Sequence, residues 1–173
     1  MSFDDRPQRI LLPVNPLFVG MTLLFALLFN LMPWRDTTGL PDLVALILTF
    51  WCVREPRKMG IGFAWVLGLL IDAADGALLG QHAFAYSALA FGAMGLSRRI
   101  LWFPLWQQAT HVFLLLFMTQ FLMLAVRMAS GASFPGVLYF LGSIIAAALW
   151  PIANVVLLAP QRRPENVDEN RPL

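Results

Sequence analysis

The sequence has few charged residues and a single cysteine. Only 13% of its 173 residues are charged and 59% are hydrophobic, whereas a soluble domain has about 25% charged residues. Water solvates a surface with so little charge poorly, which predicts a protein that lies in a lipid bilayer. The lone cysteine, Cys52, excludes an internal disulfide and leaves a structural zinc site without its usual ligands.

The motifs of common enzyme classes are also missing from the sequence. It has no Gly-x-Ser-x-Gly elbow, and no glycine-rich phosphate loop precedes Lys58, the only lysine. The two histidines, His82 and His111, have no neighbouring residues at metal-ligand spacing. We therefore expect no catalytic residues, no cofactor and no metal.

What the sequence does contain is a series of apolar runs bounded by polar residues, proline or glycine. They are Leu17–Pro33, Asp42–Val53, Met59–Ile71, Ala83–Leu96, Leu105–Val126 and Gly136–Leu158. Crossing a bilayer core of about 30 Å takes roughly 20 helical residues, and about 17 can suffice. The pattern predicts an all-α polytopic membrane bundle of six transmembrane helices over residues 1–160, followed by a disordered cytoplasmic tail over residues 161–173.

Two of these runs are irregular. The second is short for a membrane span, and Asp42 after Pro41 predicts its first helical turn. Trp51 near its other end is expected to mark the membrane interface. Pro151 lies inside the last run and should bend it, because proline removes a helical hydrogen bond.

The basic residues predict an orientation. With six spans, ten of them fall on one side and only Arg35 and Arg127 on the other. The ten are Arg6, Arg9, Arg54, Arg57, Lys58, Arg98, Arg99, Arg162, Arg163 and Arg171. Cytoplasmic loops carry the excess of basic residues in membrane proteins, so both termini are predicted to be cytoplasmic.

Two carboxylates follow the third apolar run, and their location has two interpretations. Asp72 and Asp75 can both lie at the outer membrane interface, where Gly76 ends the helix. Alternatively, Asp72 faces the interior of the bundle and pairs with a polar side chain, since an unpaired carboxylate in a membrane is costly. The candidate partners are Gln81, His82 and Arg127.

Small residues gather in the third and fourth runs. Gly76 and Gly80 have the Gly-x-x-x-Gly spacing that allows two helices to approach closely. The backbones of these runs are therefore expected to pack against each other or against a partner helix.

An ordered set of motifs resembles the MreD family of rod shape-determining proteins, in particular its proteobacterial branch. The motifs are Met32-Pro33-Trp34, Pro41-Asp42 leading to Phe50-Trp51, Pro56-Arg57 before Gly60-x-Gly62, Gly68-x-x-x-Asp72-x-x-x-Gly76-x-x-Leu79-Gly80, Leu105-Trp106-Gln107-Gln108-Ala109 and Leu149-Trp150-Pro151. The resemblance covers residues 20–155 and implies a non-enzymatic protein of the bacterial inner membrane. It also implies a fold similar to the substrate-binding subunits of energy-coupling-factor transporters.

The resemblance further implies partners and a function. MreD-like proteins associate with MreC and act with MreB, RodA and the transpeptidase partner of RodA in lateral peptidoglycan synthesis and rod shape. A scaffold that binds MreC is therefore the first hypothesis, and a transporter subunit that binds a small molecule in a cavity is the alternative. The candidate interface or polar cluster consists of Asp42, Asp72, Asp75, Gly76, Gly80, Gln81 and His82.

Two basic turns suggest a contact on the cytoplasmic side. The residues are Arg54, Arg57, Lys58, Arg98 and Arg99. Their partner would be anionic lipid of the bilayer or MreB, although the membrane orientation alone also accounts for these charges.

Overall fold

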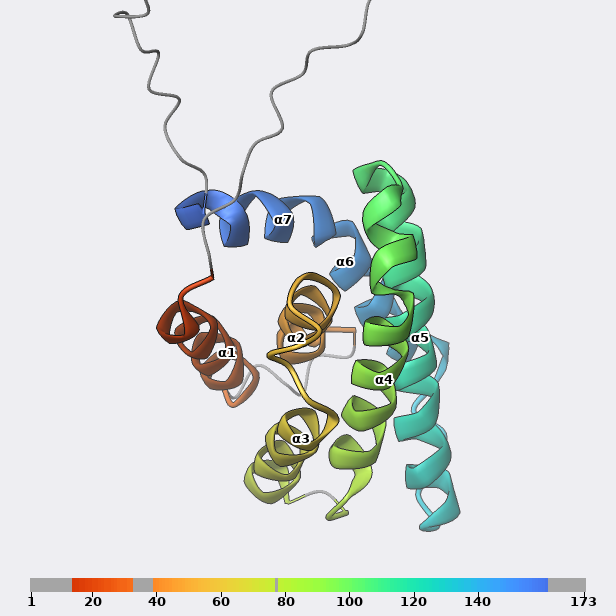
Figure 1. Ribbon diagram of the computed structural model, residues 1–173. Helices are drawn as coiled ribbons and strands as arrows, with labels where there is room; N and C mark the ends of the chain where they lie inside the picture. Colours follow the sequence, from red (N-terminus) through yellow and green to blue (C-terminus); the bar gives the residue numbers. More distant parts are fainter. Residues whose placement is uncertain (1–13, 33–38, 77, 162–173) are drawn as a thin grey trace, which may run out of the picture.

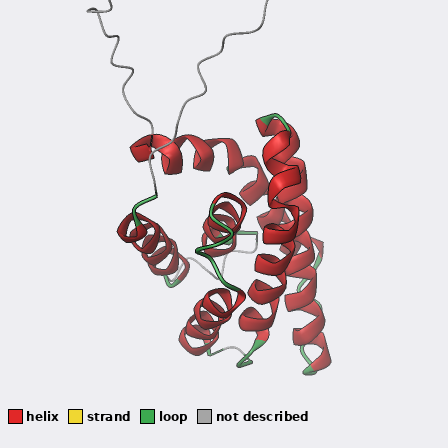
Figure 2. Ribbon diagram, in the orientation of Figure 1, coloured by secondary structure: helices red, strands yellow, loops and turns green. Residues whose placement is uncertain are grey.

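Helices make up the part of the chain that the computed structural model describes, residues 14–32, 39–76 and 78–161 (Figures 1 and 2). The α-helices are α1 (Pro16–Asn30), α2 (Leu43–Arg54), α3 (Ile61–Asp75), α4 (Gln81–Trp102), α5 (Leu105–Ala129), α6 (Leu141–Ala148) and α7 (Trp150–Leu158). Short 3-10 helices, η2 (Val137–Phe140) and η3 (Ala159–Gln161), flank the last two. The predicted all-α class is thus confirmed for the described ranges, while Pro33, Trp34 and the tail after Gln161 lie outside them.

The short second helix, α2, forms the centre of the bundle. Nine of its twelve residues are buried, and it packs against α1, α4, α5, α6 and α7. Its length is about 18 Å, which is short for a bilayer. Because protein surrounds it, α2 does not have to match the thickness of the lipid by itself.

Asp42 and Trp51 lie near the two ends of α2, and the sequence predicted a role for each. Asp42 is the residue before the helix, and its side chain accepts a hydrogen bond from the Ala45 N–H, which confirms the predicted start. The prediction that Trp51 lies at the membrane interface is wrong. Its indole is fully buried and its Nε1 donates to Thr22 Oγ1 of α1 at 3.0 Å.

The helices around α2 have large apolar side chains on their outer faces. Exposed examples on α1, α3, α4, α5 and α7 are Leu17, Met21, Phe25, Phe63, Trp65, Leu70, Phe84, Phe91, Leu114, Met118, Phe121, Ile152 and Val156. Monomeric soluble proteins rarely expose apolar patches on this scale. A lipid environment removes the cost of such a surface.

One described helix, α5, is long and apolar enough to cross a membrane by itself. Residues 137–161 would make a second crossing if their two helical halves form one bent span. The halves meet at an angle of 41°, which confirms the bend predicted at Pro151. The helices α1 and α2 are apolar but shorter, so the number of six spans remains a prediction.

The two long helices, α4 and α5, lie side by side (Figure 1). The prediction that Arg98 and Arg99 lie in a turn is wrong. They belong to the last turns of α4, which continues to Trp102, because arginine favours helix and no glycine or proline interrupts the segment. The helix ends after Trp102, because Phe103 has the extended backbone that a residue before proline adopts.

Candidate functional site

Asp72 of α3 binds the beginning of α4. It is fully buried, and its carboxylate accepts hydrogen bonds from the backbone N–H groups of Gly80 at 2.8 Å, His82 at 2.9 Å and Ala83 at 3.3 Å. The first N–H groups of a helix have no partner within it, and Gly80 has no side chain to supply one. Asp72 therefore caps α4 from a different helix, with its charge at the positive end of the α4 dipole.

The ring of His82 completes this arrangement. Its Nδ1 lies 2.7 Å from Asp72 Oδ1, and because an ionised carboxylate only accepts hydrogen bonds, Nδ1 is the donor. Of the two sequence interpretations of Asp72, the structure has the one with an interior carboxylate. Among the described residues, neither Gln81 nor Arg127 donates a hydrogen bond to it, while Asp75 lies half-buried in the last turn of α3.

Gly68 makes the Asp72 contact possible. It lies one helical turn before Asp72 and on the same face of α3. A β-carbon at position 68 would lie 2.6 Å from the carbonyl carbon of His82 and closer still to the backbone of Ala83. Only glycine allows α3 to approach α4 this closely. Gly68 belongs to a sequence motif but was not among the predicted site residues; its spacing to Asp72 was the available signal.

Gly76 and Gly80 have a different role from the predicted one. Gly76 ends α3 with φ of +60°, and Gly80 precedes α4 with φ of +102°. A β-carbon at either position would meet no atom within 4 Å. A close contact of this pair with another helix of the same chain is therefore ruled out, because the two glycines lie in the connection between helices, where they supply a left-handed backbone. A contact with a partner helix stays a prediction.

Asp42 joins three helices. Its Oδ1 accepts hydrogen bonds from Asn30 Nδ2 of α1 at 2.8 Å and from the Ala45 N–H of α2 at 3.0 Å. Its Oδ2 accepts one from the Tyr86 hydroxyl of α4 at 2.7 Å. The Tyr86 ring also meets the His82 ring edge to face, with centroids 5.9 Å apart.

These contacts form one connected group, which we call the polar chain. It consists of Asp72, His82, Tyr86, Asp42 and Asn30. It runs from α3 through α4 and α2 to α1, so four helices depend on it for their relative positions. Gln81, although buried in the first turn of α4, does not belong to the chain.

A second set of hydrogen bonds joins α2, α5 and α7. Arg54, the last residue of α2, donates to Asn154 Oδ1 at 3.0 Å, and Asn154 Nδ2 donates to the Trp150 carbonyl oxygen at 3.1 Å. Trp150 Nε1 donates to Gln108 Oε1 at 3.2 Å, and Gln108 Nε2 donates to the carbonyl oxygen of Phe103 at 2.9 Å. Two motifs far apart in sequence, around Gln108 and around Trp150, thus meet at this point.

The candidate basic residues differ in whether their side chains are already bound within the protein or free to contact a partner. Arg54 is half-buried and bound to Asn154, so it contributes to packing. Lys58 has Glu55 as an ion-pair partner at 3.5 Å. Arg57, Arg98 and Arg99 are exposed, and within the described part of the chain no carboxylate pairs with them.

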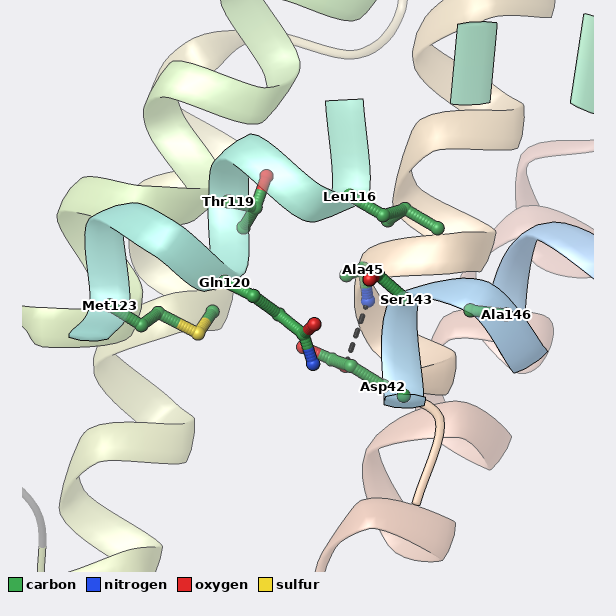
Figure 3. A pocket seen from close by; sticks show the side chains of 9 residues that line it. Asp42, Ala45, Leu116, Thr119, Gln120, Met123, Ser143 and Ala146 are labelled. Atoms are coloured by element: carbon green, nitrogen blue, oxygen red, sulfur yellow. Dashed lines mark hydrogen bonds between the residues drawn. The ribbon is translucent and has the colours of Figure 1, made fainter. Parts of the chain in front are cut away.

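A small pocket lies between α2, α5 and α6 (Figure 3). Its lining residues are Asp42, Ala45, Leu116, Thr119, Gln120, Met123, Gly142, Ser143 and Ala146. The space admits about one water molecule, whereas pockets for small organic ligands measure roughly 300–1,000 Å³. Asp72, Asp75, Gln81 and His82, the cluster that suggested a transporter, do not line it.

The described ranges also lack a group that could hold a metal. In residues 14–32, 39–76 and 78–161, no three histidine, cysteine, aspartate or glutamate side chains come together. Asp72 and His82 form a pair whose hydrogen bonds are made within the protein. This geometry makes the polar chain a support for helix positions.

Comparisons with known proteins give one consistent result. The family model for rod shape-determining protein MreD matches residues 13–158. A relative named rod shape-determining protein MreD, from Haemophilus influenzae, is 29% identical over 144 residues, which cover 80% of this chain and 86% of the relative. No solved structure matches, so the similarity to energy-coupling-factor transporter subunits stays a prediction.

Proposed function

The chain belongs to the MreD family of rod shape-determining proteins, and from this premise we propose that it is a non-enzymatic scaffold that binds MreC in the bacterial inner membrane. Membership in the family supports a membrane location and a role in determining rod shape. The family is a structural one and is not known for enzymes. The family match carries the proposal, because it covers residues 13–158 and hence almost every described helix.

The interior of the bundle supports a scaffold more than a transporter subunit. The central helix α2 is buried, and the carboxylates of the polar chain accept hydrogen bonds from the protein's own N–H and O–H groups. The surface that remains for a partner is the apolar outer face of the helices and their connections. We propose six spans, formed by α1, α2, α3, α4, α5 and residues 137–161, with both termini in the cytoplasm.

The predicted MreC interface divides into buried and accessible residues. Asp42, Asp72 and His82 belong to the polar chain, so their contribution would be to fix the helices that MreC contacts. Gly76 and Gly80 lie in the α3–α4 connection, where substitution strains the backbone as well as any interface. Leu79, between them, is a better probe because its side chain is 72% exposed.

The interface can be tested with a pair of equally exposed leucines. Leu79→Ser should reduce co-purification of MreC, while Leu17→Ser on α1, also 72% exposed, should not. Both variants remove the same apolar side chain from the surface, so differences in membrane insertion are controlled. Wild-type recovery of MreC with the Leu79 variant would contradict a contact at the α3–α4 connection.

The function itself can be tested by replacement. In a rod-shaped bacterium whose own MreD is removed, this chain should restore rods and lateral peptidoglycan synthesis together with that species' MreC. MreB, RodA and the transpeptidase partner of RodA are proposed members of the same assembly. Spherical cells, despite normal insertion of the chain and expression of a cognate MreC, would contradict the proposed role.

We also propose a cytoplasmic contact at Arg57, Lys58, Arg98 and Arg99, with anionic lipid or MreB as the partner. Exposure of these side chains supports it, and Arg54 is left out because Asn154 holds it. The double variant Arg98→Glu with Arg99→Glu should impair rod shape while the protein still inserts. If cells with that variant keep a normal rod shape, these charges serve only to orient the protein in the membrane.

A further inference from the structure

Gln120 of α5 has a buried acceptor atom without a donor. Its Oε1 is inaccessible to solvent, and no donor among the described residues reaches it. Its Nε2 donates only a long hydrogen bond, of 3.4 Å, to the Tyr139 carbonyl oxygen. A buried carbonyl oxygen that lost its hydrogen bond to water and gained none in the protein is destabilising, so such atoms usually have a partner.

The surroundings fix the side-chain amide of Gln120 in this place. A β-carbon at Gly142 of α6 would lie 2.9 Å from Gln120 Nε2 and 2.6 Å from the Leu40 carbonyl oxygen. The helix α6 therefore packs its bare backbone against the amide. Exchanging the amide oxygen and nitrogen would lose the hydrogen bond to the Tyr139 carbonyl oxygen and place two acceptor oxygens against each other, so the exchange is unfavourable.

The orphan oxygen belongs to a residue that lines the pocket between α2, α5 and α6 (Figure 3). Further acceptors line the same space. The Ser143 hydroxyl donates its proton to the Phe140 carbonyl oxygen at 2.8 Å, which leaves its oxygen to accept, and Asp42 contributes a carboxylate. The pocket has the size of about one water molecule, and a water is retained in such a space when it has two or more polar partners.

We propose that this pocket is a binding site for one water molecule, which donates a hydrogen bond to Gln120 Oε1. Its second hydrogen has acceptors in Ser143 and Asp42. Since Asp42 already belongs to the polar chain, the water extends that chain to α5 and α6. The extended chain then joins the six helices α1 to α6 through hydrogen bonds and the contact between the His82 and Tyr86 rings.

Hydroxyl-radical labelling driven by X-rays tests this site, because radicals form from water bound inside a protein as well as from bulk water. Met123 lines the pocket and is 4% exposed, whereas Met59 is 6% exposed and lies away from it. In the full chain reconstituted in nanodiscs, Met123 should be oxidised at least severalfold faster than Met59. Equal rates would overturn the proposal.

Two variants separate a bound water from general loosening of the helices. Ala146→Val adds two methyl groups to the pocket lining, and Gln120→Leu removes the orphan acceptor while affecting a residue that is only half-buried. Each should lower Met123 labelling to the level of Met59 and leave Met59 unchanged. If Ala146→Val does not fold, Gln120→Leu decides alone, and persistent rapid labelling of Met123 in it would overturn the site.

Discussion

Replacing Gly68 with alanine should separate α3 from α4 and release Asp72 from the start of α4. The added β-carbon would lie 2.6 Å from the His82 carbonyl carbon, whereas carbon atoms in contact are about 3.6 Å apart. The helices must therefore move apart by roughly 1 Å. The Asp72 hydrogen bonds, now 2.7 to 3.3 Å, would then exceed hydrogen-bonding distance.

The size of the effect follows from these two losses. Overpacking of a close contact costs about 1–3 kcal/mol, and hydrogen bonds to a charged group contribute about 1.5–3 kcal/mol each. Because the two losses share the same movement, we expect a total near the upper end of the first range, about 3 kcal/mol. For a chain of this size the melting temperature should fall by about 6–12 °C.

Thermal melting of the detergent-purified protein, followed by tryptophan fluorescence, measures this change. Gly62→Ala is the matched control, because Gly62 is also in α3 and a β-carbon there would meet nothing within 4 Å. Alanine favours helix over glycine by up to about 1 kcal/mol, so the control should melt at the wild-type temperature or slightly above. Equal melting of both variants would refute the close approach at Gly68.

Three further substitutions probe the same hydrogen bonds and contacts. Asp72→Asn keeps the shape but places an N–H₂ group against backbone donors, so melting should fall by the equivalent of about 1–3 kcal/mol; wild-type melting would mean that the negative charge is not needed. Tyr86→Phe removes one hydrogen bond to Asp42 and should cost about 1 kcal/mol; wild-type melting would contradict a stabilising role for this hydrogen bond. Gly142→Ala should destabilise the protein because its β-carbon would lie 2.6 Å from the Leu40 carbonyl oxygen, whereas Gly95→Ala meets nothing within 4 Å and should melt normally.

Local sequence signals predicted much of the helical pattern. Asp42 after Pro41 marked the start of α2, and Pro151 marked the bend in the last helical segment, because capping and the missing proline N–H act within a few residues. The helical ends at Gly76 and before Pro104 follow from similar local rules. Such features do not depend on which helices become neighbours.

Features that depend on neighbours were not predictable in this way. Tryptophan often marks the membrane interface, but Trp51 is buried because α2 lies at the centre of the bundle. Gly76 and Gly80 have the spacing of a packing motif, but they fall outside the helices. Asp72 was recognised as unusual, yet its role as a cap required knowledge that Gly68 brings α3 against α4.

The most direct test of the proposed scaffold is the amount of MreC that co-purifies with the chain. The chain, carrying an affinity tag, should replace the resident MreD in a rod-shaped bacterium and be purified from its membranes in mild detergent. The account predicts that MreC is recovered with it and that the cells remain rods. Cells that stay rod-shaped while no MreC accompanies the chain, before or after cross-linking, would contradict the claim that it acts by binding MreC.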